Sequence, residues 1–271
     1  MKKKDVFVST IKGLIAGIAL WINNMSIASI ILSTNSYDHV VEGLSNVRKK
    51  NNKDLWYVTV PLLIGICIGL LAGHHTISFF LKKWQLQTII LFVGLFVGGI
   101  RVIFAKQKLD LNRKNIFIPI IVLFIAIMWI IFMKNKSFDI ENNILYALIL
   151  GLISGISILV PGMSVVTSNI KHGYATMIKI LNNLVSLNDC IVLIVFTIVC
   201  IMTLILFSKI VKLSINKNKN NTYIALCSCI LANVIILIAG IKPVTINFLN
   251  IFTSILAFLW GYLFAKNVER E

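Results

Sequence analysis

The stretch Val160-Pro161-Gly162-Met163-Ser164-Val165-Val166-Thr167-Ser168 lies inside residues 142–170, which contain no Asp, Glu, Lys or Arg. An uncharged run of this length predicts a membrane segment, because about 20 helical residues cross a bilayer core. Pro161 removes a backbone donor and pushes the preceding residue out of helical geometry, and Gly162 adds freedom at the same point. A broken helix at membrane depth is tolerated only inside protein or beside a water-filled cavity. The break therefore predicts a polar site within the membrane.

A second uncharged stretch, residues 13–37, has a polar centre of the same kind, Trp21-Ile22-Asn23-Asn24-Met25-Ser26. The two stretches are identical at seven of 14 positions at a constant offset of 138 residues, with Asn23-Asn24 standing where Pro161-Gly162 stands. Seven identities in one register predict an internal repeat, and each copy has one broken stretch followed by three plain apolar spans.

The composition fits a protein that crosses the membrane several times. Of 271 residues, 58% are hydrophobic and 13% are charged, about half the charged share of a soluble domain. This excludes an ordinary cytosolic enzyme and a disordered chain. The net charge of +16 comes from short Lys and Arg clusters between apolar runs, which predicts contact with anionic lipid headgroups and no nucleic-acid partner. The five cysteines lie in or beside apolar runs and are predicted to be buried apolar residues.

The positions of Lys and Arg predict the topology. If all eight uncharged stretches cross the membrane, the two faces receive 14 and 12 of these residues, which is no bias. If both broken stretches are re-entrant hairpins, the faces receive 19 and 7, the most polarised distribution. Each arm of a hairpin, estimated at about 10–15 residues, is too short to cross alone. The N- and C-termini are then cytoplasmic, and the two hairpins enter from opposite faces and meet near the midplane.

The predicted fold is an all-α integral membrane protein of two inverted repeats, each with one re-entrant helical hairpin and three transmembrane helices. Repeat 1 is residues 1–138, with a hairpin at about 6–40 and spans at about 56–81, 85–104 and 115–133. Repeat 2 is residues 139–271, with a hairpin at about 142–182 and spans at about 189–209, 221–240 and 245–265.

At the two hairpin tips the sequence resembles the PopT-type polyprenyl-phosphate transporters, whose tips read Pro-Gly-x-Ser-Gly-Gly-Thr with a Gly-x-Tyr about a dozen residues later. The first copy here reads Asn23-Asn24-Met25-Ser26-Ile27-Ala28-Ser29, and the second reads Pro161-Gly162-Met163-Ser164-Val165-Val166-Thr167. The first copy lacks Pro-Gly, and both lack the Gly-Gly pair. The resemblance covers nearly the whole chain and implies recycling of undecaprenyl phosphate, a lipid carrier for cell-envelope synthesis, from the outer to the inner leaflet of a bacterial cell membrane.

The tip residues are the predicted binding site for the phosphate. Free backbone N–H groups at a half-helix N-terminus attract an anion, and hydroxyl and amide side chains donate hydrogen bonds to it. The alternative is that these small polar residues only satisfy the broken helix backbone or allow close helix packing. The candidates are Asn23, Asn24, Ser26, Ser29, Pro161, Gly162, Ser164 and Thr167.

Three further ionisable residues lie within or beside the apolar stretches. Arg101 is a candidate for phosphate attraction, with snorkelling to the interface as its alternative. His74 and His75 are candidates for proton coupling, with a hydrogen-bonded pair near the outer surface as their alternative.

Catalysis has little support in the sequence. The acids all lie in or beside the connecting segments, and neither a metal-binding nor a nucleotide-binding motif occurs. His39 beside Asp38 is the one weak candidate. We therefore predict a transporter that is not an enzyme, has no cofactor or metal, and has polyprenyl phosphate and membrane lipids as partners. A transporter of small organic anions or other lipid phosphates, a non-transporting membrane partner protein, and a homo-oligomer are left open.

Overall fold

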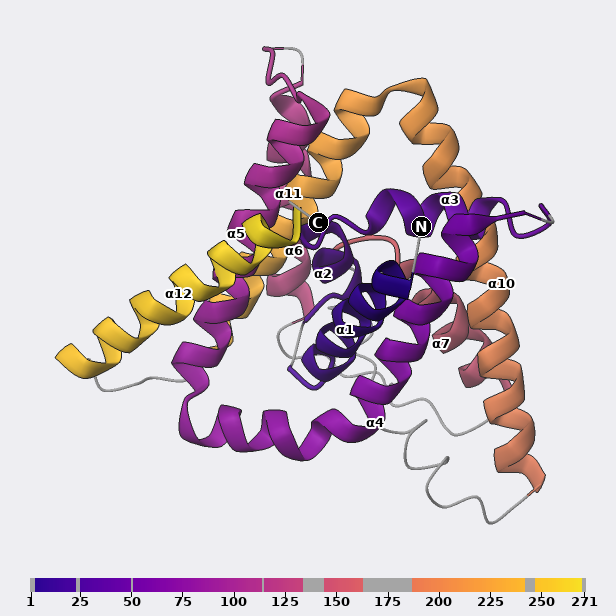
Figure 1. The fold of residues 1–271 in the computed structure, drawn as a ribbon, viewed down its shortest axis with the longest axis horizontal. Coiled ribbons are helices and arrows are strands. Elements are labelled where there is room, and N and C mark those ends of the chain that lie inside the picture. Colours follow the sequence, from indigo (N-terminus) through magenta and orange to yellow (C-terminus); the bar gives the residue numbers. More distant parts are fainter. Residues whose placement is uncertain are drawn as a thin grey trace.

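A computed structural model of the chain describes residues 3–22, 25–49, 51–113, 115–133, 144–162, 187–241 and 247–269, and these residues are helical apart from short turns and loops (Figure 1). The elements of the first half are α1 (Lys3–Ala19), α2 (Ile27–Ser33), α3 (Tyr37–Ser45), a π-helix η1 (Leu55–Thr59), α4 (Val60–Lys83), α5 (Gln85–Gln107) and α6 (Phe117–Met133). Those of the second half are α7 (Ile144–Ser157), α10 (Leu187–Lys217), α11 (Lys219–Ala239) and α12 (Phe248–Glu269).

Five helical segments among the described residues are long and apolar enough to cross a membrane. They are Leu55–Gly73, Gln85–Gln107, Cys190–Lys217, Lys219–Ala239 and Phe248–Asn267. Five of the six predicted plain spans are thereby confirmed as apolar helices of membrane-spanning length. The sixth prediction, residues 115–133, corresponds to α6, an apolar helix of 17 residues.

Within the described residues, helical structure ends close to both predicted break positions. Helix α1 ends at Ala19, a turn follows, and α2 begins after Ser26, whose side chain accepts a hydrogen bond from the Ser29 amide. Helix α7 ends at Ser157, four residues before Pro161. The arms are unequal: α1 has 17 residues and α2 has seven, whereas the estimate was about 10–15 for each arm.

After the first break the chain doubles back along α1. The Lys12 ammonium, midway along α1, donates to the Ser36 hydroxyl at 3.2 Å, 24 residues later in the chain. Residues 12–36 therefore form a hairpin. That this hairpin enters and leaves a membrane on one face stays a prediction.

Glycines allow parallel helices to pack backbone against backbone. A Cβ on Gly17 of α1 would overlap the carbonyl oxygen of Ile66 in α4, and one on Gly69 of α4 would lie 2.9 Å from the amide nitrogen of Ile18. The same relation joins α7 to α10, where a Cβ on Gly155 would lie 2.7 Å from the carbonyl oxygen of Cys200. Small residues at spacings of four are how membrane helices approach this closely.

The two halves exchange helices across their boundary. Helix α5 packs along α12, where a Cβ on Gly94 would overlap the carbonyl oxygen of Phe258, and α11 packs on α6. The 138-residue offset of the repeat relates the packed pair of α1 and α4 to the packed pair of α7 and α10. It relates the pair of α5 and α12 to the pair of α11 and α6. This pairing is what a two-fold arrangement would produce, although the inverted repeat itself stays a prediction.

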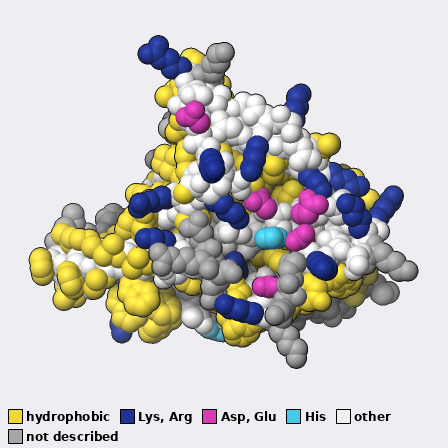
Figure 2. Space-filling view, turned by 45° about the horizontal axis from the view of Figure 1, so that its top comes forward, with side chains coloured by type: hydrophobic (Ala, Val, Ile, Leu, Met, Phe, Trp, Pro, Cys, Tyr) yellow, Lys and Arg dark blue, Asp and Glu magenta, His cyan; other side chains and the backbone are white. Residues whose placement is uncertain are grey.

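Polar contacts gather at one end of the molecule, where α3 meets the ends of α5 and α10 and the start of α11 (Figure 1). The Asp38 carboxylate accepts from Gln107 of α5 at 3.0 Å and from the hydroxyl of Tyr223 of α11. Glu42 pairs with Lys212 of α10 at 2.6 Å. Figure 2 shows charged side chains over this part of the surface and hydrophobic ones over the projecting α12. This ion pair places Glu42 and Lys212 on the same side of the molecule, whereas eight membrane crossings would put them on opposite faces; the re-entrant hairpins stay a prediction.

Candidate binding site at the two helix breaks

The two breaks meet through a backbone-to-side-chain contact. The amide of Gly162, just after the end of α7, donates to the Oγ of Ser26 at 3.3 Å, across 136 residues of sequence. Ser26 is fully buried and also accepts from the Ser29 amide at 3.4 Å. Both distances are at the long end for N–H···O bonds, so these contacts are weak and exchangeable.

A second hydrogen bond joins the same regions. The hydroxyl of Tyr37, the first residue of α3, donates to the carbonyl oxygen of Leu159 at 2.8 Å, and both residues are buried. Leu159 lies past the last residue of α7, so Tyr37 satisfies a carbonyl outside the regular helix. Tyr37 is not among the predicted site residues, although Asn35-Ser36-Tyr37 stands where the family has Gly-x-Tyr after the first tip.

Asn233 of α11 is a site residue that the sequence reasoning missed. The Oγ of Ser29 donates to its Oδ1 at 3.4 Å, and both side chains are fully buried. Asn233 lies inside a predicted plain span, where a single amide within an apolar run was the available signal. The candidate site therefore combines the first break, the second break and the middle of α11.

This arrangement suits an anion bound by hydroxyl groups. Ser26 accepts two hydrogen bonds, and no acceptor for its hydroxyl hydrogen lies among the residues that the structure describes. The surroundings are apolar, with Met25, Ile22 and Ile230 in the same buried cluster. In an environment of low dielectric constant, a hydrogen bond to a charged oxygen is stronger than in water. Helix α2, with seven residues, adds little dipole, so the binding chemistry depends on side chains more than was predicted.

Gly162 has a backbone conformation that favours glycine, with φ of +83°. An L-residue has a steric cost in this conformation, which glycine avoids while its amide donates to Ser26. Pro161 is buried beside it. These two predicted residues thus shape the second break, and Gly162 supplies the contact.

The structure does not bring the other described candidates to the breaks. Arg101 is exposed on α5, where it donates to the hydroxyl of Tyr262 and its guanidinium carbon lies 5.9 Å from that ring's centroid. His75 lies beyond the candidate span Leu55–Gly73 in the last part of α4, and its side chain is exposed. This position agrees with the surface alternative for the histidine pair. His74 lies in the same helix, but its side chain is outside the described residues, as are the predicted site residues Asn23, Asn24, Ser164 and Thr167.

The weak catalytic candidate has a different partner from the predicted one. The Nδ1 of His39 lies 2.8 Å from an oxygen of Asp54, not of Asp38, and the histidine side chain is half exposed. Among the described residues no group of three or more His, Cys, Asp or Glu side chains could hold a metal ion.

Comparison with known proteins gives one match. Residues 1–117, from α1 through α5, match a family model described as VCA0040-like, undecaprenyl phosphate translocase-like. No curated protein and no solved structure matches the chain. Over residues 1–117 the match confirms the resemblance to undecaprenyl-phosphate transporters, and with the apolar helices it indicates a membrane transport protein.

Proposed function

We propose, from the family match of residues 1–117 and from the contact between the two helix breaks, that the chain transports undecaprenyl phosphate from the outer to the inner leaflet of a bacterial cell membrane. The protein spans the membrane several times, with both termini in the cytoplasm. Its function is translocation without chemical change of the lipid.

The observation that carries this proposal is the Gly162 amide donating to the Ser26 hydroxyl. Two interrupted helices from opposite halves of the chain meet at a buried polar point, which is where transporters built from inverted repeats place their substrate. A phosphate oxygen accepts from the same donors, namely the Gly162 amide and the Ser26 and Ser29 hydroxyls.

In the proposed mechanism the phosphate replaces weak contacts within the protein. An oxygen that enters between the breaks takes the Gly162 amide and separates it from Ser26, while the prenyl chain stays in lipid. The hydrogen bonds between the breaks then re-form only after the phosphate leaves toward the other leaflet. Rocking of one half against the other exposes the site to each leaflet in turn.

Substitution of the two buried serines tests the site. Ser26→Ala with Ser29→Ala removes both hydroxyls, and we expect headgroup translocation in proteoliposomes to fall at least about tenfold, the effect of losing about 1.4 kcal/mol of binding. Ser214→Ala, on the exposed surface of α10, is the matched control and should transport at the wild-type rate. Wild-type rates in the double variant would contradict binding at the breaks.

Thiol labelling tests the orientation. The five native cysteines are first replaced, and one new cysteine is then introduced in each variant. Val47→Cys lies between the first hairpin and the start of α4, and Lys83→Cys lies at the end of α4. A membrane-impermeant maleimide added outside intact cells should label position 83 and leave position 47 unlabelled. Labelling of position 47 from outside would overturn the topology.

A further inference from the structure

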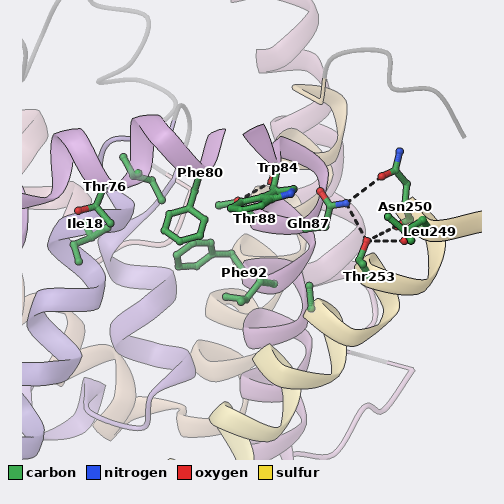
Figure 3. Close-up of a pocket in the computed structure, with 13 residues that line it drawn as sticks. Ile18, Thr76, Phe80, Trp84, Gln87, Thr88, Phe92, Leu249, Asn250 and Thr253 are labelled. Carbon is green, nitrogen blue, oxygen red and sulfur yellow. Dashed lines mark hydrogen bonds between the residues drawn. The ribbon is translucent and has the colours of Figure 1, made fainter. Parts of the chain in front are cut away.

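A cavity of about 660 Å³ lies away from the helix breaks, where the end of α4 and the starts of α5 and α12 meet (Figure 3). Its volume is in the range of cavities that hold small ligands, about 300–1,000 Å³. The rings of Phe80, Trp84 and Phe92 line it, and Ile18, in the last turn of α1, closes it on the side of the first break.

The cavity lies at the end of the molecule opposite the Asp38 cluster. Gln87 lines the cavity and Gln107 contacts Asp38, and the 20 residues of α5 between them span about 30 Å. This distance equals the thickness of a bilayer core. In the predicted topology the cavity is therefore level with the outer leaflet.

Three polar side chains of the cavity already contact one another, and the hydroxyl of a fourth, Thr88, donates to the carbonyl oxygen of Trp84. The amide of Gln87 donates to the Oγ1 of Thr253 at 3.0 Å and lies 3.5 Å from the Oδ1 of Asn250 (Figure 3). The surface that a ligand would contact is therefore mainly made of aliphatic and aromatic side chains. Such a cavity favours a hydrocarbon chain over a polar headgroup.

A positive charge lies at the edge of this apolar space. The ammonium of Lys83 is 4.7 Å from the centroid of the Trp84 ring, and Lys82 precedes it, with both side chains exposed. Among the described residues neither lysine has a carboxylate partner. A hydrocarbon cavity with unpaired ammonium groups at its edge is complementary to an anionic amphiphile.

We propose that this cavity is an outer-leaflet capture site for the lipid substrate, in which the cavity takes part of the prenyl chain and Lys83 attracts the phosphate. The identity of the lipid rests on the proposed function. Capture here places the prenyl chain beside Ile18, one residue before the end of α1, and so holds the lipid close to the first helix break.

Photo-crosslinking tests the cavity directly. The probe is a polyprenyl phosphate with a diazirine in its chain, used with the full-length protein in nanodiscs, and labelled peptides are mapped by mass spectrometry. We expect labelling in residues 84–92 and 248–257. Ala257→Trp fills the cavity and should reduce that labelling about tenfold, whereas Ile255→Trp, exposed on the same helix, should not change it. Leu249→Trp, at an exposed lining position, provides a second filling variant if the first does not fold.

Two further arms separate the capture site from the site at the breaks. The same probe ending in an alcohol should label the cavity several-fold less, and Lys83→Gln should reduce labelling by the phosphate probe to the level of the alcohol. The Ser26→Ala, Ser29→Ala variant should keep cavity labelling while losing transport. Labelling therefore tests the capture site, and transport tests the site at the breaks, independently of each other. Unchanged labelling in both filling variants, or equal labelling by phosphate and alcohol, would overturn the capture site.

Discussion

Replacing Gly69 by alanine should weaken the packing of α1 against α4. A Cβ on Gly69 would overlap the carbonyl oxygen of Leu14 and would lie 2.9 Å from the amide nitrogen of Ile18, and both are backbone atoms that cannot move without their helix. The helices must separate by roughly an ångström, and a gap of this size forfeits about half of the local dispersion energy. Overpacking of this kind costs about 1–3 kcal/mol, and the better helix propensity of alanine returns up to about 1 kcal/mol.

We therefore expect Gly69→Ala to lower stability by about 1–2 kcal/mol and the midpoint of thermal unfolding in detergent by about 4 °C. Gly240→Ala is the matched control, because its Cβ would meet nothing nearer than the carbonyl oxygen of Leu237 at 3.5 Å and its φ is −83°. That variant should unfold within about 1 °C of the wild type. Equal midpoints for the two variants would refute the backbone-to-backbone packing of α1 and α4.

Three other changes have definite expected outcomes. Tyr37→Phe leaves the buried carbonyl of Leu159 without its donor and should cost about 1–3 kcal/mol in the free energy of unfolding, measured by denaturant titration; no loss would mean that another donor replaces it. Gly162→Ala forces an L-residue to φ near +83° and should cost about 1–2 kcal/mol in the same titration, with transport reduced more than by Ser214→Ala; wild-type stability would show that the break tolerates another conformation. Glu42→Gln removes the partly exposed ion pair to Lys212 and should cost no more than about 1 kcal/mol, a difference that disappears in 1 M salt; a loss that persists in salt would indicate that packing, not charge, holds α3.

The sequence could predict the breaks because their cause is local. A proline and a glycine within an uncharged run interrupt the helix whatever surrounds them, and the repeat transferred the same conclusion to the first copy. The apolar helices were predictable for the same reason, since length and the absence of charge suffice.

The partners of the site residues were not predictable, because they depend on how distant helices face one another. Asn233 lies in a span that looked featureless, and only the packing of α11 against the first hairpin gives it a role. Arg101 is a candidate for phosphate attraction or for snorkelling from its position near the end of a span, and only the packing of α5 against α12 shows that it donates to Tyr262. The sequence of one helix does not fix which face meets which neighbour.

The exchange of helices between halves has a consequence for biogenesis. The backbone at Gly94 of α5 packs on that of α12, and α12 is synthesised about 140 residues after α5. Until α12 is inserted, the face of α5 around Gly94 lacks the helix that packs on it. Truncation within α12 should therefore send the nascent protein to membrane proteases, even though most of the chain has already been inserted.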